Sequence, residues 1–280
     1  MDYRVDMVIT DLDGTLFNDN KQISGRDIKT LVWLGSQSII RVIATGRNLF
    51  SARKALHPET PVDFLIFSTG AGAIEWKTGK LIYAEHLRET EVALAIETLK
   101  EAGISFMVHD LVPDNHAFLY HDADCGNNDF QRRLDLYHDF AAPLELDPPN
   151  YTHASQLLAI VPENLALLEE IRGKLASMRV IRTTSPLDGQ TMWLEVFPAE
   201  VSKGHTTEWL CRKTGTDANR TLGLGNDYND IDLLNFVKFP YAMENAPDPI
   251  KKLYPHCMSN NDSGFSDAVR QVTGISPGNE

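Results

Sequence analysis

Cysteine is scarce in this sequence, and the three that it has are isolated. Cys125, Cys211 and Cys257 stand far apart and in no CxxC spacing. This distribution argues against a disulfide framework or a zinc site, and it is compatible with a reducing compartment.

Basic side chains are fewer than acidic ones, and long hydrophobic runs are absent from the sequence. The 26 basic and 39 acidic side chains leave a net charge of −13, which disfavours binding to nucleic-acid phosphates or anionic lipid. No apolar stretch approaches the roughly 20 residues that span a bilayer. The amino terminus has no basic segment leading into an apolar one, as a signal peptide would. We expect a cytoplasmic protein that binds neither nucleic acid nor membranes.

The remaining composition is that of a folded globular protein. Apolar residues make up 42% and charged residues 23% of the chain, which excludes a disordered or collagen-like protein. Its 280 residues are enough for one large domain or two ordinary ones.

Short apolar runs alternate with helical patterns in the first part of the chain. Val5–Thr10, Ile39–Ala44 and Phe64–Phe67 are typical of buried strands, and helices are expected from Ser24 and over Leu49–Leu56. Strands that alternate with helices pair in parallel through right-handed crossovers. The pattern therefore predicts an α/β fold with a doubly wound parallel sheet, and the same alternation returns after residue 190.

The middle of the chain has a different character. Residues 84–189 combine expected helices with short strands in an order typical of an α+β domain with an antiparallel sheet. This segment holds 8 basic and 18 acidic side chains, net −10, whereas the remainder holds 18 and 21, net −3. We expect a core formed by residues 1–83 and 190–280, with residues 84–189 inserted as a separate module.

Polar residues follow the predicted core strands, where open α/β sheets bind ligands. The first strand leads into Asp11-Leu-Asp13-Gly-Thr15, the second into Thr45-Gly46-Arg47, and a later one into Asn226-Asp-Tyr-Asn-Asp230. Lys203 lies in the first turn of a helix that leads back into the same sheet. Acids, a hydroxyl and a lysine should therefore gather at one edge.

The two aspartates after the first strand suggest a specific chemistry. Two carboxylates two residues apart point to the same side and repel each other, which a divalent cation relieves. Carboxylates from two strand ends suit Mg²⁺, which also takes water and phosphate oxygens. A carboxylate beside Mg²⁺ and a phosphoryl group is a candidate nucleophile, and its neighbour can serve as general acid and base.

These residues resemble the four motifs of the haloacid dehalogenase (HAD) superfamily, in order: Asp11 to Leu16, Thr45 to Arg47, Lys203, and Gly225 to Asp230. The position of the insert resembles that of the C2B cap in the Cof-type (subfamily IIB) group. The resemblance implies an HAD-like core with an α+β cap that sets specificity. It also implies a Mg²⁺-dependent phosphatase acting on a small phosphorylated metabolite, often a sugar phosphate.

The resemblance also implies roles for individual residues. Asp11 would be the nucleophile and Asp13 the acid and base, while Arg47 would bind substrate. The residues expected to bind phosphate are Thr45, Gly46, Lys203, Asn229 and Asn245. The residues expected to hold Mg²⁺ are Asp11, Asp13, Asn226, Asp227 and Asp230.

One position departs from the family pattern. The last motif usually reads Gly-Asp-x-x-x-Asp, and here Asn226 stands at the first Asp, followed by Asp227. Either Asn226 binds the metal through its carbonyl oxygen, or a local shift gives that role to Asp227. The four-residue step to Asp230 favours Asn226.

Other features leave alternatives open. A phosphotransferase or mutase would use the same chemistry, and a weakly active metabolite-binding protein would explain Asn226. Arg132 and Arg133 could bind a second anion of the substrate, although adjacent helical residues face different ways, so one of them at most is a candidate. Six histidines in the insert show no metal-binding spacing. We expect a monomer or homodimer whose partner is a small phosphorylated molecule.

Overall fold

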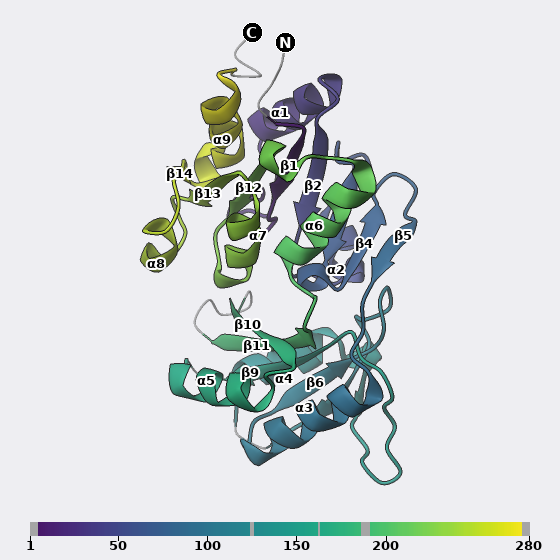
Figure 1. The fold of residues 1–280 in the computed structure, drawn as a ribbon. Helices are drawn as coiled ribbons and strands as arrows, with labels where there is room; N and C mark the ends of the chain where they lie inside the picture. Colours follow the sequence, from purple (N-terminus) through teal and green to yellow (C-terminus); the bar gives the residue numbers. More distant parts are fainter. Residues whose placement is uncertain (1–4, 124–125, 162, 186–190, 276–280) are drawn as a thin grey trace. The chain divides into compact units, whose positions relative to one another are not determined.

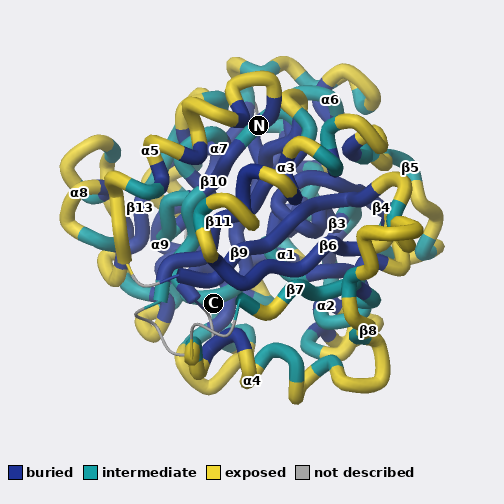
Figure 2. The backbone as a smooth tube through the Cα atoms, turned by 90° about the horizontal axis from the view of Figure 1, so that it is seen from below, coloured by how far each residue is buried: buried dark blue, intermediate teal, exposed yellow. Residues whose placement is uncertain are grey.

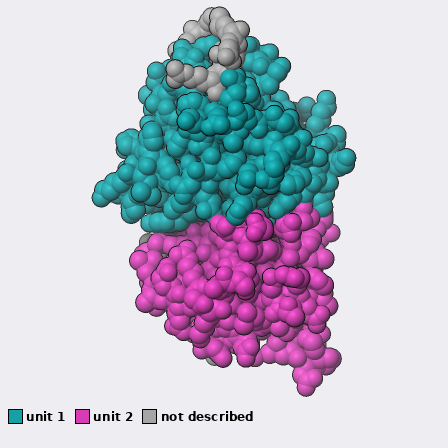
Figure 3. Space-filling view, in the orientation of Figure 1, with its two compact units in different colours: residues 1–47, 51–83, 202–280 teal, residues 48–50, 84–201 magenta. Residues whose placement is uncertain are grey.

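The computed structural model describes residues 5–123, 126–161, 163–185 and 191–275. The chain divides into two compact units (Figure 3). Unit 1 comprises residues 1–47, 51–83 and 202–280, and unit 2 comprises residues 48–50 and 84–201. Unit 2 is thus inserted between two parts of unit 1.

Unit 1 is built on an eight-stranded sheet in the described part of the chain (Figure 1). Parallel pairing joins its first six strands, and β4 then pairs antiparallel with β3. The order is β14 (His256–Cys257), β13 (Phe239–Met243), β12 (Thr221–Gly225), β1 (Met7–Thr10), β2 (Ile40–Ala44), β3 (Phe64–Phe67), β4 (Gly72–Glu75) and β5 (Leu81–Ala84). The predicted α/β class with a parallel-sheet core is confirmed.

Helices bury the apolar side chains of this sheet. Met7 and Ile9 of β1 form one hydrophobic cluster with Leu210 of α6 and Leu233 of α7. Two other helices, α1 and α9, pack together, with Thr30 and Ser266 hydroxyls 2.8 Å apart. The helices of unit 1 include α1 (Gly25–Ser36), α2 (Leu49–Ala55), α6 (Lys203–Thr214), α7 (Ile231–Phe236), α8 (Asp248–Lys251) and α9 (Gly264–Thr273).

The sheet order brings the expected site residues to one edge. β1 lies between β12 and β2 and pairs in parallel with both. Asp11, Thr45 and Asn226 follow these three strands, so they leave the sheet side by side at its carboxyl edge. A single-turn 3-10 helix at Ser68–Gly70 follows β3 directly. Another, at Tyr228–Asp230, lies in the turn after β12.

Unit 2 has its own sheet and core. Leu157, Ala159 and Leu194 belong to a buried cluster with residues of α3 and α5, and Figure 2 shows the central strands as deeply buried. Among the described residues, the strand pairs of this sheet are antiparallel except β7 and β8, which are parallel. The order is β10 (Met178–Thr184), β11 (Met192–Pro198), β9 (Gln156–Val161), β6 (Phe106–His109), β7 (Phe118–His121) and β8 (Ala141–Pro143), with helices α3 (Glu89–Glu101), α4 (Asn128–Leu136) and α5 (Leu165–Lys174).

The second boundary of the insert differs from the one that the sequence predicts. The expected junction at 189/190 lies outside the described residues, and unit 2 continues to Val201. The reason is β11, which pairs with β9 and β10 rather than with the sheet of unit 1.

Two of the three cysteines lie within the described residues. Cys211 and Cys257 are buried free thiols, and Cys125 lies outside the described residues. In the described ranges we find no helix with the length and apolarity to cross a bilayer.

Candidate active site

Asp11 and Asp13 leave the end of β1 in a tight turn. The backbone N–H of Asp11 still donates to the Leu224 carbonyl at 3.0 Å, so its position is fixed by the sheet. Gly14 has φ +75°, a conformation that side chains rarely adopt. A Cβ atom at position 14 would lie 2.7 Å from Nδ2 of Asn226, so glycine lets that side chain approach the turn.

The ammonium of Lys203 is completely buried between carboxylates. Its Nζ donates to Oδ1 of Asp11 at 2.7 Å and to Oδ1 of Asp230 at 2.6 Å. It also donates to Oδ1 of Asn229 at 3.3 Å. Lys203 therefore holds one oxygen of Asp11 in place and leaves the other, Oδ2, for a different partner.

The local sequence explains how Lys203 reaches this position. Ser202 caps α6 by accepting a hydrogen bond from the His205 N–H at 3.1 Å, which makes Lys203 the first helical residue. Gly204 lets the helix approach the start of α7 closely. A Cβ atom there would lie only 2.4 Å from the Asp232 carbonyl oxygen.

The charges of this cluster are strongly coupled. Burial raises the pKa of Asp11 to about 7, Lys203 opposes the rise, and Asp230 adds to it. Burial alone would lower the pKa of Lys203, but the charges of Asp11 and Asp230 outweigh burial and raise it. Asp11 therefore depends on nearby positive charge to stay ionised, and a cation at Oδ2 would supply more of it.

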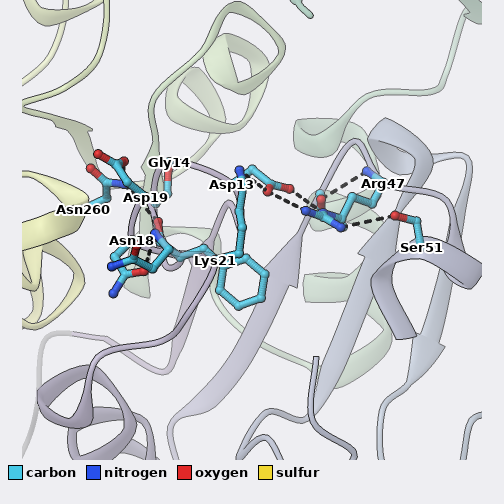
Figure 4. A network of polar contacts seen from close by, with 12 residues as sticks. Asp13, Gly14, Asn18, Asp19, Lys21, Arg47, Ser51 and Asn260 are labelled. Carbon is cyan, nitrogen blue, oxygen red and sulfur yellow. Dashed lines mark hydrogen bonds and ion pairs between the residues drawn. The ribbon is translucent and has the colours of Figure 1, made fainter. Parts of the chain in front are cut away.

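The carboxylate of Asp13 is bound by two basic side chains (Figure 4). Arg47 donates a hydrogen bond to each carboxylate oxygen, from Nε to Oδ2 at 2.6 Å and from Nη2 to Oδ1 at 2.7 Å. Lys21 Nζ lies 3.2 Å from Oδ1, and Ser51 supports Arg47 by accepting from Nη1 at 3.2 Å. Burial would raise the pKa of Asp13, but the hydrogen bonds and charges of Arg47 and Lys21 lower it. Asp13 is ionised at neutral pH in this arrangement.

Three potential oxygen ligands, one of them Asp11 Oδ2, lie close together after β1 and β12. One amide atom of Asn226 is 3.2 Å from Asp11 Oδ2, 2.9 Å from the Asp13 carbonyl oxygen and 2.8 Å from Thr15 Oγ1. Without a cation, the amide NH₂ in that place donates to these oxygens. With its carbonyl oxygen there instead, the spacing approaches the ~2.9 Å between neighbouring ligands of octahedral Mg²⁺ at 2.0–2.1 Å.

The donor set fits Mg²⁺ but differs from the expected one. It consists of one carboxylate, one backbone carbonyl and one amide, all of them hard oxygens. The carboxylates of Asp13 and Asp230 are turned to Arg47 and Lys203. In keeping with this, the described residues contain no group of three or more His, Cys, Asp or Glu side chains placed to hold a metal.

Asp227 and Asp230 shape the turn after β12. Asp230 Oδ2 accepts from the backbone N–H groups of Asn226 at 2.8 Å and of Asp227 at 2.9 Å. The Asp227 carboxylate accepts from the Tyr228 N–H at 2.8 Å and caps the following 3-10 turn. The turn thus points the side chain of Asn226, rather than that of Asp227, toward Asp11.

The residues expected to hold phosphate are neighbours. Thr45 is buried, and its Oγ1 accepts from the Arg47 N–H at 3.1 Å. A Cβ atom on Gly46 would lie 3.4 Å from Nδ2 of Asn229, which in turn contacts Lys203. Backbone and side-chain donors of these residues therefore lie along the edge that carries Asp11.

Comparison with known proteins identifies the family of this chain. The family model of haloacid dehalogenase-like hydrolases matches residues 8–269, nearly the whole chain. The chain belongs to this family. The resemblance drawn from the motifs is therefore confirmed, and with it the expectation of a hydrolase.

Relatives of this haloacid dehalogenase-like hydrolase include a Streptococcus pyogenes protein named "Putative phosphatase M6_Spy0533". The two are 24% identical, with 95% of this chain and 98% of the relative covered. Among solved structures, BT1666 from Bacteroides thetaiotaomicron, described as a phosphatase of the superfamily, is 17% identical with a TM-score of 0.76 (97% and 96% covered). The subclass IIB sugar phosphatase BT4131 is 18% identical with a TM-score of 0.75 (97% and 100% covered). These similarities confirm the fold.

Two expected site residues of this haloacid dehalogenase-like hydrolase have other contacts. Asn245 donates to the Gly14 carbonyl at 2.8 Å and accepts from the Asn260 N–H at 3.1 Å. Asn245 thus links the turn after β1 to the segment at Asn260. These contacts do not support the expected role of Asn245 in binding phosphate. Arg47, expected to bind substrate, is instead paired with Asp13.

Two residues of this edge, Lys21 and Thr69, are not among those expected from the sequence. Lys21 binds Asp13 from a loop with no motif, so no local pattern marks it. Thr69 lies beside Gly46 and has φ 54° in the turn after β3. The rule that ligands bind at the carboxyl ends of parallel strands applies to β3 as well, so it could have identified Thr69.

Proposed function

We propose that this protein is a Mg²⁺-dependent phosphatase that hydrolyses a small phosphorylated metabolite, a sugar phosphate, through an aspartyl-phosphate on Asp11. The observation that carries the proposal is the setting of Asp11. One of its oxygens is fixed by Lys203, and the other lies 3.2 Å from an amide atom of Asn226 that is itself 2.9 Å from the Asp13 carbonyl oxygen. The named relatives, which include a sugar phosphatase, support the substrate class.

The chain's own residues supply each chemical step. A carboxylate oxygen of Asp11 attacks phosphorus, and the bond from phosphorus to the leaving oxygen breaks. Asp13 gives a proton to that oxygen, then takes one from a water molecule that attacks phosphorus and releases Asp11. Lys203, Asn229, the Thr45 hydroxyl and the Gly46 N–H hold the phosphate oxygens.

Asp13 must change partners to take both roles. In its contact with Arg47 and Lys21 it is ionised, which suits the second step, in which it acts as a base. The first step needs a protonated Asp13 turned away from Arg47. We infer that substrate binding accompanies this exchange.

Mg²⁺ would be held by Asp11, the Asp13 carbonyl and Asn226. When bound, it neutralises charge on the phosphate and on Asp11 as the transition state forms. Asp227 and Asp230 support this set by fixing the turn that carries Asn226. We further infer that unit 2 selects among leaving groups and that the protein acts in the cytoplasm.

A screen of phosphorylated metabolites tests the proposal. We expect release of inorganic phosphate from hydroxyl-rich monophosphates with Mg²⁺ and no added acceptor, and none with excess EDTA. Asp11→Asn should abolish turnover because an amide cannot attack phosphorus. Release that required an acceptor sugar would indicate a phosphotransferase. Ligand-induced thermal stabilisation without any release would indicate a binding protein, and either result would overturn the proposal.

A further inference from the structure

The turn that follows β1 carries two of the proposed Mg²⁺ ligands, Oδ2 of Asp11 and the carbonyl oxygen of Asp13. Its backbone folds back on itself, because the Phe17 N–H donates to the Leu12 carbonyl at 2.7 Å. Gly14 lies within this turn and has φ +75°. Since glycine hardly restricts its own torsion angles, contacts from other segments must fix the direction of the preceding carbonyl.

Two asparagines from the last part of the chain bind this turn. Asn245 Nδ2 donates to the Gly14 carbonyl at 2.8 Å, and Asn260 Nδ2 donates to the Phe17 carbonyl at 3.1 Å. The two asparagines are also joined to each other, because the Asn260 N–H donates to Oδ1 of Asn245 at 3.1 Å. This asparagine pair therefore connects two points of the turn through residues that lie 231 and 243 positions further along the chain.

Asn260 belongs to a segment with its own support. It is 3% exposed and begins the single-turn 3-10 helix Asn260–Asp262, between β14 and α9. The Gly264 N–H donates to the Ser259 carbonyl at 3.0 Å. A Cβ atom on Gly264 would lie only 2.0 Å from the Met258 carbonyl oxygen, so this segment packs directly against the start of α9. The contacts with α9 hold Asn260 in place for its bonds to the turn.

The neighbouring Asn261 makes comparable hydrogen bonds to the loop beyond the turn. Its Nδ2 donates to Oδ2 of Asp19 at 2.9 Å, and its Oδ1 accepts from the Asp19 N–H at 3.1 Å. Asn260 Nδ2 also donates to Asp19, to Oδ1 at 3.0 Å (Figure 4). Both asparagines thus hold the loop, and of these two residues the one bonded to the Phe17 carbonyl is Asn260.

The peptide that presents the Asp13 carbonyl lies between two fixed points. On one side Leu12 is bonded to Phe17, and on the other the Gly14 carbonyl is bonded to Asn245. Mg²⁺ demands near-ideal octahedral geometry, so a small rotation of this peptide would move the carbonyl oxygen out of place.

We propose that Asn245 and Asn260 are positioning residues for the Mg²⁺ site, which hold the Asp13 carbonyl in the direction that the cation needs. The pair acts through Gly14 and Phe17 and does not itself supply a metal ligand. This inference rests on the proposed function, because it concerns the cation on which the phosphatase depends.

Binding of Mn²⁺ tests the proposal without turnover. Mn²⁺ favours the same oxygen ligands and octahedral geometry as Mg²⁺, and electron paramagnetic resonance counts the free ion. At room temperature, Asn245→Ala and Asn260→Ala should each weaken binding about five-fold or more, because each removes one hydrogen bond to the turn. The matched control, Asn261→Ala, removes hydrogen bonds to Asp19 and should weaken binding by less than about two-fold.

Thermal unfolding in EDTA separates positioning from a purely structural role. Asn260→Ala removes a buried amide and should lower the unfolding temperature. Asn245 is exposed, so Asn245→Ala should remain folded and decides the question even if Asn260→Ala does not fold. Lower stability with unchanged Mn²⁺ affinity, an equal loss of affinity in Asn261→Ala, or no Mn²⁺ binding by the wild-type protein overturns the proposal.

Inorganic phosphate distinguishes this role from the phosphate-binding role that the sequence suggested for Asn245. At saturating Mg²⁺ the cation site is filled, so calorimetry should give the same phosphate affinity for Asn245→Ala and the wild-type protein. A loss of phosphate affinity in Asn245→Ala, without a loss of Mn²⁺ affinity, would restore the phosphate-binding role and overturn the proposal.

The two proposals fail in different ways. A protein that releases no phosphate, yet binds Mn²⁺ in a manner that depends on Asn245 and Asn260, refutes the phosphatase and keeps the positioning role. A working phosphatase whose Mn²⁺ affinity is independent of both asparagines refutes the positioning role alone.

Discussion

Replacing Asn226 by Asp should change stability and metal binding in opposite directions. The new carboxylate would stand about 3 Å from Oδ2 of Asp11, where the amide atom of Asn226 now lies at 3.2 Å. At an effective dielectric constant near 20, two unit charges 4 Å apart repel by about 4 kcal/mol. Protonation of one carboxyl relieves part of this. We therefore expect the metal-free Asn226→Asp protein to lose ~1–3 kcal/mol of unfolding free energy.

The same carboxylate should strengthen Mg²⁺ binding. A second charged ligand attracts the cation, and the metal removes the repulsion that destabilises the free protein. We expect the Mg²⁺ concentration for half-maximal thermal stabilisation to fall about ten-fold or more, since ~1.4 kcal/mol corresponds to a factor of ten. Thermal unfolding in EDTA and across a Mg²⁺ titration measures both effects without an activity assay.

Asp227→Asn is the matched control for this experiment. The Asp227 carboxylate caps a 3-10 turn, and an Asn side chain can accept the same hydrogen bond from Tyr228. We expect little change in the Mg²⁺ midpoint. A sharp rise with Asp227→Asn, together with no effect of Asn226→Asp, would refute the assignment of Asn226 to the metal.

Three further perturbations have defined outcomes. Lys203→Met leaves Asp11 and Asp230 buried without a counter-charge and should reduce the metal-free unfolding free energy by about 3–5 kcal/mol, measured by urea unfolding; an unchanged midpoint would contradict this. Asp13→Asn removes the proton donor, so turnover of alkyl phosphates should fall about 10²–10⁴-fold, much more than that of nitrophenyl phosphate, whose leaving group needs no proton; equal losses would argue against Asp13 as the acid. The pKa of His109 falls from 6.5 to about 3 on folding, so the unfolded chain binds the proton more readily. This contribution to stability is complete above pH 6.5 and declines toward pH 3 by about 1.4 kcal/mol per pH unit, a slope that His109→Gln should remove.

Sequence periodicity predicted the fold well because strands and helices alternate clearly. Val5–Thr10 and Phe64–Phe67 coincide with or contain β1 and β3, and their order predicts which residues leave the sheet at its carboxyl edge. The expected core included residues 190–280 and therefore β11, which instead pairs in the sheet of unit 2. An apolar strand looks the same whichever sheet it joins, because its partners are set by tertiary contacts.

Side-chain direction was harder to predict than position. The sequence brought Asp13 and Asp230 to the correct edge, but it could not show that both carboxylates turn to basic side chains. Those contacts depend on Lys21 and Lys203, which come from other segments. The choice between Asn226 and Asp227 likewise depended on the backbone of one turn, where Asp230 fixes two consecutive N–H groups.

The central place of β1 in its sheet has a consequence for synthesis of the protein. β1 emerges first from the ribosome, but its neighbour β12 begins only at Thr221. The edge of β1 that later pairs with β12 therefore stays unpaired until β12 has been synthesised. Unpaired edges of apolar strands promote aggregation. Residues 84–201 are contiguous and complete before that point. We expect the nascent chain to fold its inserted unit first and to complete the sheet of unit 1 only after β12 has been made, so that Asp11 and Asn226 meet late in folding.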